Sequence, residues 1–353
     1  MISLKVPGRI CFFGDHQDYL GLPVIAGTIN RFLYLEANPI NPTNFQVELS
    51  DTQESYSLDL SFPLSQKPKN YFESGLQYLQ NKGAGFSQGY AIRIWSEIPI
   101  KAGLSSSSAL VVAWLRFLLE AQEDIPFPNS ETLGHWAYEV EVLAFEQPGG
   151  LMDQYTIAQG GLLYIDTDSQ QSHPLPLPNF HWVVAESGIE KKTLEVLKNA
   201  KEWQQKAIAT VSQIAPNFDL KKSTPNDYNQ FLEALPKFLH DHWYACLHNY
   251  AITLDARTAF FYNPNPEVLG SLMQAHQEIL ATKIQNTPPA LVAMIEAAQV
   301  AGAYGSKIIG SGGGGCLVAL VESATKQTVI EAFLAHGAKT AYEVTITPIH
   351  ESQ

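Results

Sequence analysis

The first group of chemically active side chains follows an apolar segment near the amino terminus. The sequence GRICFFGDHQDY spans residues 8–19 and brings together Arg9, Asp15, His16, Asp18 and Tyr19. Carboxylates accept hydrogen bonds, whereas imidazole and phenol groups can both donate and accept, so this group can bind several hydroxyls of a sugar at once. The alternative is a polar surface turn with one capping aspartate. Because the preceding segment is so apolar, the charges are focused at its end, and we favour the binding interpretation.

A second group is the glycine- and serine-rich turn PIKAGLSSSSA at residues 99–109. A strand-like run at 90–98 precedes it and an apolar, helix-like run at 110–121 follows it. A helix start exposes unpaired N–H groups and the positive end of the helix dipole, so phosphate binds there readily. Gly103 permits a close approach of the backbone, and the serine hydroxyls can bind phosphate oxygens or Mg2+. Taken alone, this turn has a flexible loop before a capped helix as its equal alternative.

Two further stretches could contribute to a site. Asp153, in GGLMDQY at residues 149–155, is the lone carboxylate between Gln147 and Leu163. Such a carboxylate is a candidate base or charge stabiliser, although without context a helix-start residue that complements the dipole is the simpler interpretation. The third glycine-bearing stretch, KIIGSGGGGC at residues 307–316, has five glycines in six positions from Gly310 to Gly315. Apolar strands flank it, so we expect its backbone to pack tightly against another loop or a phosphate rather than to form a simple hairpin loop.

The elements expected from hydrophobic periodicity place these stretches at strand ends and helix starts. Strands are predicted at residues 2–13, 23–37, 45–49, 56–60, 90–98, 162–165, 307–309, 316–321 and 343–349. Helices are predicted at residues 71–80, 110–121, 131–144, 191–215, 227–238, 241–259, 266–284, 289–301 and 326–336. Ser130 is the expected N-cap of the third helix, and the first helix is expected to present one face made of Tyr71, Gly75, Tyr78 and Leu79.

Length and composition limit the classes of protein to consider. A chain of 353 residues favours two domains, and prolines at 174, 176 and 178 form a stiff connection that places the boundary near residue 178. The net charge of −13 argues against nucleic acid and anionic membranes as partners. The three cysteines have no metal-binding spacing, which fits reduced thiols in the cytoplasm. No cationic leader with a long apolar run and no apolar run of about 20 residues is visible, so we predict neither a signal peptide nor a membrane helix.

Together the three stretches resemble the GHMP kinases, the superfamily of galactokinase, homoserine kinase, mevalonate kinase and phosphomevalonate kinase. Residues 101–109, KAGLSSSSA, resemble the phosphate-binding motif of that superfamily, and residues 307–316 resemble its C-terminal glycine motif. Residues 8–19 are similar to the galactokinase signature G-R-x-N-x-x-G-[ED]-H-x-D-Y, and residues 150–154, GLMDQ, are similar to G-I-M-D-Q. The resemblance implies an α+β fold with a mixed-sheet domain at 1–178 and a ferredoxin-like domain with inserted helices at 179–353.

The resemblance also implies an activity. It indicates an ATP-dependent sugar kinase of carbohydrate metabolism that phosphorylates a hydroxyl of galactose or a related sugar, the anomeric hydroxyl first, with ATP and Mg2+ as cofactors. It implies catalytic roles for Asp153 and Arg9, and sugar contacts for Asp15, His16, Asp18 and Tyr19. The implied ATP-binding residues are Lys101, Gly103, Leu104, Ser105, Ser106, Ser107, Ser108, Gly312 and Gly313, and the implied Mg2+ ligands are Ser107 and Glu141.

The sequence departs from the galactokinase pattern at several places. Cys11 replaces the usual asparagine, Asp15 stands where glutamate is more frequent, and the segment after Ser187 lacks the arginine- and tyrosine-rich pattern of galactokinases. Other acceptors therefore stay open, namely a uronic acid, an amino sugar, a heptose phosphate or a mevalonate-type acid. A non-catalytic sensor that binds ATP and a sugar is the alternative from another class, and both a monomer and a dimer are compatible with the sequence.

Overall fold

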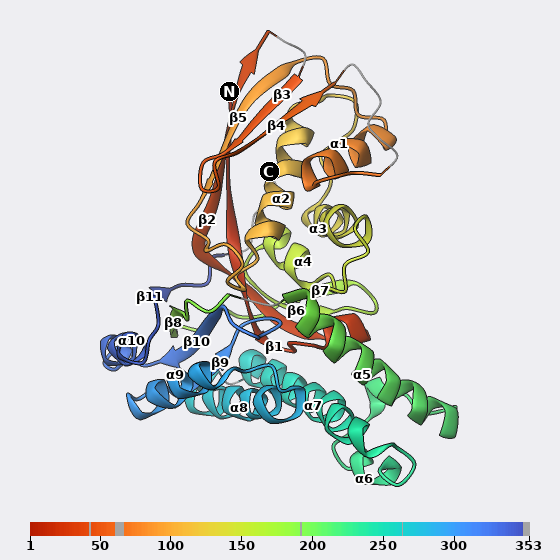
Figure 1. The fold of residues 1–353 in the computed structure, drawn as a ribbon, viewed down its shortest axis with the longest axis vertical. Coiled ribbons are helices and arrows are strands. Elements are labelled where there is room, and N and C mark those ends of the chain that lie inside the picture. The colour runs from red at the N-terminus through yellow and green to blue at the C-terminus, as the bar shows by residue number, and fades with distance from the viewer. Residues whose placement is uncertain (42–43, 61–66, 191–192, 263, 349–353) are drawn as a thin grey trace.

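The protein has two β-sheets, one from each half of the chain, and helices pack against each of them (Figure 1). The computed structural model describes residues 1–41, 44–60, 67–190, 193–262 and 264–348. The first sheet and its helices form the upper part of the molecule in Figure 1, and the second sheet and its helices form the lower part.

The first sheet is mixed and has seven strands. Its order is β4-β3-β5-β2-β6-β7, with β1 paired to β2; β3 and β5 are parallel and the other pairs are antiparallel. The strands are β1 (Ile2–Phe13), β2 (Val24–Ile40), β3 (Asn44–Leu49), β4 (Glu54–Asp59), β5 (Gly89–Ser96), β6 (Leu162–Asp166) and β7 (Gln171–Pro174). The apolar run at the end of β1 is buried throughout, because helices and other strands cover both of its faces.

Four α-helices cover one face of this sheet (Figure 1). They are α1 (Tyr71–Asn81), α2 (Ser106–Glu120), α3 (Ser130–Tyr138), which continues into a π-helix at Glu139–Leu143, and α4 (Met152–Gln159). Helix α2 is apolar on nearly every side after its serines, and such helices lie in a core. Its Trp114 and Phe117 pack against Phe45 of β3, with ring centroids 5.9 and 5.3 Å apart. This burial fixes the start of α2 relative to the sheet.

The second sheet is antiparallel, with the strand order β11-β8-β10-β9. Numbered within the second half, this is the order 4-1-3-2 of a ferredoxin-like fold, in which helices cover one face of a four-stranded sheet. Its strands are β8 (His181–Glu186), β9 (Gly305–Ile308), β10 (Cys316–Val321) and β11 (Thr340–Val344). Its helices are α5 (Thr193–Ile214), α6 (Asp227–Phe231), α7 (His240–Tyr262), α8 (Pro266–Ile279), α9 (Pro289–Val300) and α10 (Lys326–Ala335). The predicted fold class is confirmed.

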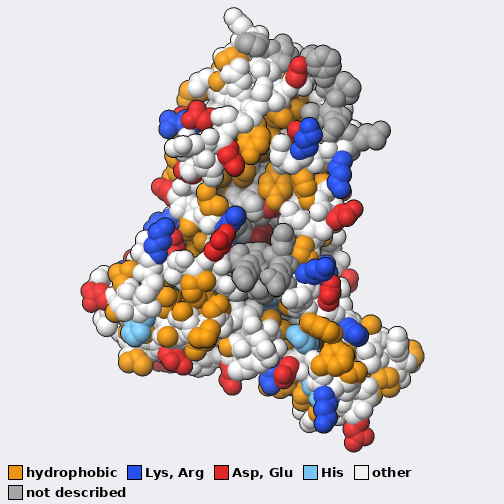
Figure 2. Space-filling view, viewed as in Figure 1, with side chains coloured by type: hydrophobic (Ala, Val, Ile, Leu, Met, Phe, Trp, Pro, Cys, Tyr) orange, Lys and Arg blue, Asp and Glu red, His pale blue; other side chains and the backbone are white. Residues whose placement is uncertain are grey.

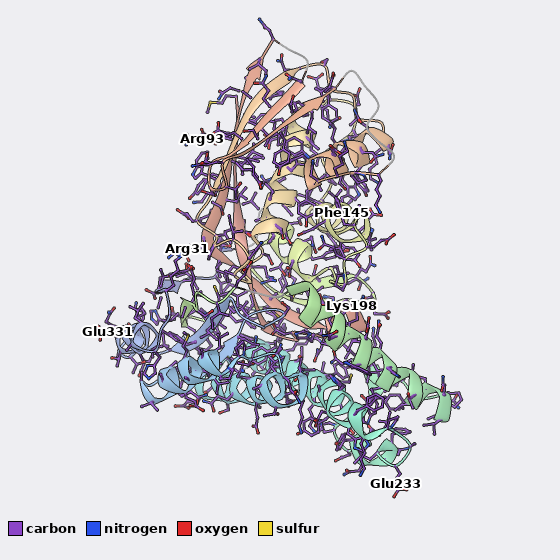
Figure 3. The ribbon with its side chains drawn as sticks, viewed as in Figure 1. Arg31, Arg93, Phe145, Lys198, Glu233 and Glu331 are labelled. Carbon is purple, nitrogen blue, oxygen red and sulfur yellow. The ribbon has the colours of Figure 1, made fainter. Side chains whose placement is uncertain are left out.

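The two halves share side-chain contacts at their junction. Phe12 of β1 packs on Trp182 of β8 with ring centroids 4.5 Å apart. Arg31 of β2, labelled in Figure 3, lies over the ring of Tyr342 of β11 at 4.3 Å. The first sheet ends at Pro174 and the second begins at His181, so we propose the domain boundary between them, at residues 178/179. In the described ranges no helix is both long and apolar enough to cross a membrane.

Several helix boundaries differ from the sequence expectations. Helix α2 starts at Ser106 rather than 110, because Ser105 takes a left-handed conformation (φ 59°) that turns the chain directly into the helix. The N-cap of α3 is Asn129, whose side chain accepts from the Thr132 N–H, and not Ser130. The predicted helix 131–144 instead changes to π geometry after Tyr138. Helix α6 stops at Phe231, well before the predicted residue 238.

Other differences concern faces and strands. The buried face of α1 consists of Phe72, Ser74, Gly75, Leu76 and Leu79, so the predicted face is confirmed at Gly75 and Leu79, whereas Tyr71 and Tyr78 lie at its edge and are only partly buried. Strands β7 and β8 were not expected, because β7 is only four residues long and ends in a proline, and β8 is buried along its middle and shows no alternation. The predicted helix 266–284 is confirmed only to residue 279 and then becomes a π-helix at Leu280–Ile284. The predicted strand 343–349 is wrong in its bounds, because β11 runs from Thr340 to Val344. Its predicted end at residue 349 and the predicted helix start at residue 191 lie outside the described residues.

Candidate active site

A cavity of about 510 Å3 brings most of the sequence-predicted residues together. Figure 2 shows the molecule hollowed near the middle of this face, between its upper and lower parts. Part of the cavity wall is polar and comes from the turn after β1, the serine turn, the start of α4 and the glycine motif; it comprises Arg9, Asp15, His16, Asp18, Ser105, Ser106, Ser107, Ser108, Asp153, Gly310 and Ser311. Another part is mainly apolar and comprises Leu33, Leu49, Tyr71, Ile94, Ile100 and Leu110.

Asp153 and Arg9 form the central ion pair of the cavity. The Arg9 guanidinium donates from Nε and Nη2 to Asp153 Oδ1, both at 2.7 Å, and from Nη1 to the Gly103 carbonyl at 2.6 Å. The Ser105 hydroxyl donates to Asp153 Oδ2 at 2.5 Å. Arg9 is buried, whereas about a quarter of the Asp153 side chain, 28 %, is exposed to the cavity. Arg9 and Ser105 therefore fix the orientation of the Asp153 carboxylate, and its remaining surface is open to the cavity.

The serine turn packs directly on β1. The Arg9 N–H donates to the Leu104 carbonyl at 3.2 Å, and a Cβ at Gly8 would lie only 2.9 Å from that oxygen, so glycine is required there. Leu104 is fully buried beneath the turn and does not line the cavity. Lys101 does line it, and its ammonium lies 3.6 Å from the exposed Glu190 carboxylate. Exposed pairs of this kind contribute little stability and leave a lysine free to reorient.

Glu141 lies beside the first turn of α2. Its side chain is 4 % exposed and accepts a hydrogen bond from Gln154 Nε2 at 2.7 Å. Burial raises the pKa of Glu141, while hydrogen bonds from Gln154, Ser107 and Ser108 partly oppose this effect. The structure thus places Glu141 and Ser107 together, and their role as Mg2+ ligands stays a prediction. Among the described residues no group of three or more His, Cys, Asp or Glu could hold a metal ion, so any cation here would take its other ligands from water and nucleotide.

A residue from the second half of the chain binds the Asp15 carboxylate on the side away from the cavity. Lys307 of β9 donates to Asp15 Oδ2 at 2.6 Å, and the Gly310 N–H donates to Asp15 Oδ1 at 2.6 Å. Both side chains are fully buried, although Asp15 reaches the cavity wall. Burial acts to raise the pKa of Asp15, but the charge and hydrogen bond of Lys307, together with His276 and His16, outweigh burial and hold that pKa below the usual value. The pair joins the turn after β1 to the glycine motif.

His16 and Tyr19 form a second connection across the junction. His16 lies 2.9 Å from the Tyr19 hydroxyl through Nδ1, and through Nε2 it lies 3.0 Å from both the Ser311 carbonyl and the Asn286 amide nitrogen. The Tyr19 hydroxyl also hydrogen-bonds with the Gln204 side chain at 2.8 Å. Tyr19 does not line the cavity, so the structure places it behind His16 rather than at the predicted sugar contact.

Asp18 is a carboxylate of the cavity wall whose pKa is raised. Burial and the nearby negative charge of Asp153 raise its pKa to about 6. Its Oδ1 accepts from the Tyr19 N–H at 2.9 Å, and its Oδ2 lies where a Cβ at Gly150 would be. Arg9 lowers this pKa only in part, since its guanidinium is already paired with Asp153. Asp18 is thus available to accept hydrogen bonds from a ligand.

The glycine motif packs tightly against other loops, as its flanking strands predicted. A Cβ at Gly315 would lie 2.6 Å from the Ala102 carbonyl, and the Cys316 N–H donates to that same oxygen at 2.7 Å. The Gly313 N–H donates to the Asn286 carbonyl at 2.6 Å, and Gly312 lies against the same residue. Gly312 and Gly313 therefore do not line the cavity, whereas Gly310 and Ser311 do. Their predicted role in ATP binding stays a prediction.

Sequence reasoning missed several residues that build this site. Asn286 and Gln204 follow or lie in helices without any polar motif, and nothing in their neighbourhood points to the turn after β1. Gln154 belongs to the motif GLMDQ, which predicted no role for it, although its amide donates a hydrogen bond to Glu141. Lys307 was visible as the single charge beside the glycine motif, and a lysine within an apolar strand is a signal for a buried partner.

Comparison with known proteins gives the family. The model of the GHMP kinase N-terminal domain matches residues 70–161, and that of the GHMP kinase C-terminal domain matches residues 258–339. The galactokinase of Thermococcus kodakarensis is 27% identical over 330 residues, which cover 90% of this chain and 88% of that protein. The mevalonate kinase of Thermococcus gammatolerans is 24% identical over 355 residues, covering 97% and 96%. The structure of Lactococcus lactis galactokinase with galactose superposes with a TM-score of 0.85 at 21% identity, covering 98% of this chain and 93% of that one.

Both domain models match in the expected order, and each matched range contains one of the two glycine-bearing motifs, which shows that the chain belongs to the GHMP kinases. Within that family it is a galactokinase-like, ATP-dependent kinase.

Proposed function

We propose that this protein transfers the γ-phosphoryl group of ATP to a hydroxyl of a neutral monosaccharide, the anomeric hydroxyl of galactose or a related sugar. The observation that carries this proposal is the Asp153 carboxylate, held by Arg9 and Ser105 and exposed to a cavity whose wall also contains Asp18 and His16. A sugar hydroxyl in front of Asp153 would donate to it and be oriented for attack. Phosphoryl transfer depends mainly on such positioning and on neutralisation of charge.

The charges of the cavity argue for a neutral acceptor. Asp15 is paired with Lys307, and Asp153 with Arg9, so the cations near the turn after β1 are already committed. Asp18 remains as an uncompensated carboxylate, which its raised pKa reflects. A uronic acid, a heptose phosphate or a mevalonate-type acid would place another negative charge beside it, at a large electrostatic cost in a partly buried site. Hydroxyls, or an ammonium, are the groups that Asp18 can bind.

The phosphates of ATP are assigned to the serine turn. Helix α2 begins at Ser106, and the hydroxyls of Ser106, Ser107 and Ser108 line the cavity beside its free N–H groups. Lys101 would add a mobile positive charge. The apolar part of the cavity wall would take the adenine base.

The residues present fit Mg2+ at Glu141 and Ser107. A nearly buried carboxylate next to a serine hydroxyl supplies two oxygen ligands, and Mg2+ commonly completes its octahedron with phosphate oxygens and water. A bound cation would supply the neutralising charge that ATP needs. Glu141 and Ser107 would hold it, and Gln154 would keep Glu141 turned toward it.

A mevalonate-type acceptor is the second candidate, because a mevalonate kinase matches nearly the whole chain. A phosphorylation assay separates the two. Galactose, other neutral hexoses, 1-O-methyl galactoside, galacturonic acid, galactosamine, a heptose phosphate and mevalonate would each be incubated with ATP and Mg2+, and ADP release measured. We expect turnover with a neutral hexose and none with its 1-O-methyl derivative. Turnover confined to an anionic acceptor would overturn the proposal, and sugar binding without turnover would favour the sensor.

A further inference from the structure

One face of helix α1 contacts the π-helix in which Glu141 lies. In this segment the Ala144 N–H donates to the Glu139 carbonyl at 2.9 Å, and the Gln147 N–H donates to the Val142 carbonyl at 3.0 Å, both five residues back. Such wide turns interrupt the usual i→i+4 pattern, and they are frequent at functional sites. The Val140 carbonyl accepts a buried hydrogen bond from Ser74 Oγ of α1 at 2.9 Å. Ser74 thus satisfies a backbone group inside the π-helix.

Two tyrosines flank Ser74 on the same face of α1. Tyr71, Ser74 and Tyr78 occupy positions i, i+3 and i+7, which lie one above another on a helix. The Tyr78 hydroxyl donates to the Glu139 carboxylate, and the Tyr71 hydroxyl accepts from Gln147 Nε2 at 3.0 Å. Three hydroxyl groups of one helix therefore hold the start, the middle and the end of the segment that contains Glu141.

Helix α1 is itself fixed against α2. A Cβ at Gly75 would lie 2.7 Å from the Trp114 side chain, so the two helices approach as closely as glycine allows. The Trp114 indole N–H donates to the Phe72 carbonyl at 3.0 Å. Phe145, labelled in Figure 3 just beyond the π-helix, packs edge-on against Tyr71 with ring centroids 5.3 Å apart. Because α2 begins with Ser106 to Ser108, α1 connects the serine turn to the segment of Glu141 through rigid contacts.

We propose that Ser74 and Tyr78 are positioning residues that set the direction of the Glu141 carboxylate toward Ser107 and thereby determine the affinity for the divalent cation that accompanies the nucleotide. Neither side chain lines the cavity, so neither touches nucleotide or sugar. Val140 and Glu139 are the two residues directly before Glu141. Because Ser74 and Tyr78 hold both of them, the wide turn of the π-helix cannot rotate. The inference rests on the proposed assignment of the cation to Glu141.

The test measures cation affinity directly, with Mn2+ as the probe. Free Mn2+ would be followed by electron paramagnetic resonance during titration of the enzyme bound to a non-hydrolysable ATP analogue. We expect Ser74→Ala and Tyr78→Phe each to weaken Mn2+ binding about tenfold, as is typical for residues that orient a metal ligand. Binding of the nucleotide without metal should be unchanged. Tyr56→Phe is the matched control, since it removes another tyrosine hydroxyl that donates to a glutamate, Glu54, outside the cavity wall.

Glu141→Gln is the reference variant of the same titration. Weaker Mn2+ binding by Glu141→Gln together with wild-type affinity in folded Tyr78→Phe and Ser74→Ala would overturn the positioning role and leave the metal assignment intact. Unchanged affinity in Glu141→Gln would overturn both the assignment and this inference. Neither result bears on sugar phosphorylation, which the acceptor assay measures separately. Should Ser74→Ala fail to fold because it leaves the Val140 carbonyl unpaired, Tyr78→Phe alone decides the outcome.

Discussion

Asp153 is a carboxylate whose oxygens already accept three hydrogen bonds. Arg9 supplies two of them and Ser105 the third, so the charge is stabilised before any substrate arrives. These donors fix the carboxylate in one orientation, and its exposed part can accept a hydrogen bond from a hydroxyl. Under the proposed function it would orient the sugar hydroxyl, and such positioning is a large part of catalysis of phosphoryl transfer.

We expect Asp153→Asn to lower kcat by about 10²–10⁴-fold, because the amide can no longer both pair with Arg9 and accept the acceptor hydroxyl. Single-turnover phosphorylation of the preferred sugar would measure the loss. Nucleotide affinity, followed by calorimetric titration, should stay within about twofold, since the Asp153 carboxylate is bonded to Arg9 and Ser105 and not to Ser106, Ser107 or Ser108, to which we assign the phosphates. Near-normal turnover in this variant would remove Asp153 from the mechanism.

Asp18 should limit the stability of the free enzyme at neutral pH. Its pKa is raised from 3.8 to about 6 in the folded protein, so folding is penalised wherever this carboxylate must be ionised. The penalty is small near pH 4, grows as the pH rises toward 6, and is constant above that value. At about 1.4 kcal/mol per pKa unit it approaches ~3 kcal/mol. Asp18→Asn should therefore raise the free energy of unfolding by ~1–3 kcal/mol at pH 8 and change it little at pH 4.

Urea denaturation at the two pH values measures this effect. The same variant should bind sugar more weakly at pH 8, which separates a functional carboxylate from a merely unfavourable one. A variant that is no more stable at pH 8 than the wild type would show that Asp18 is not desolvated as the structure indicates.

The residues of the site were predictable where they belong to local motifs. Arg9 lies in β1, and Asp15, His16 and Asp18 follow the end of that strand, so one short segment of sequence brings them to the same place. Lys307 meets Asp15 across 292 positions of sequence, and Asn286 meets His16 across 270. No local pattern encodes pairs of this kind, because they depend on how the two sheets dock.

At the scale of elements, the serine turn and the glycine motif support one another. The Cys316 N–H donates to the Ala102 carbonyl and Gly315 leaves space for it, so the serine turn is held by the other half of the molecule. The sequence predicted tight packing here from five glycines between strands. It did not predict the early start of α2 or the π-helix, because left-handed serine and a wide helical turn are tertiary effects that propensity does not reveal.

Gly315→Ala should destabilise the protein by ~3 kcal/mol or more. The added methyl group would lie 2.6 Å from the Ala102 carbonyl oxygen in a residue with φ 85°, so clash and backbone strain add together. Gly83→Ala is the matched control, because Gly83 also has a left-handed φ, 101°, but open space around its Cβ position. It should cost only ~1–2 kcal/mol. Thermal and urea unfolding would give both values, and equal losses would contradict the tight contact between the two turns.

At the scale of the whole molecule, buried groups join the two halves behind the cavity. Lys307 of β9 donates to three oxygens, those of Asp15, Ile308 and Cys11, and is fully buried. Removing one partner of such a pair leaves an uncompensated charge away from water, which costs about 3–5 kcal/mol. Lys307→Met should lower the free energy of unfolding by this amount.

The double variant Lys307→Met with Asp15→Asn tests whether the charge itself, rather than packing, produces that loss. Asparagine keeps an oxygen that can accept a hydrogen bond from the Gly310 N–H, and it removes the negative charge that is left without a partner, so most of the lost stability should return.

The pH dependence gives a second signature of the pair. The low pKa of Asp15 means that the pair stabilises the fold above pH ~4 and that this contribution is lost as the pH falls further. Equilibrium unfolding of the four proteins of this cycle at pH 7, repeated at pH values below 4, measures both. If the double variant were as unstable as Lys307→Met, the junction would depend on the shape of the lysine side chain, and the two halves would be held together by packing such as that of Phe12 on Trp182 rather than by charge.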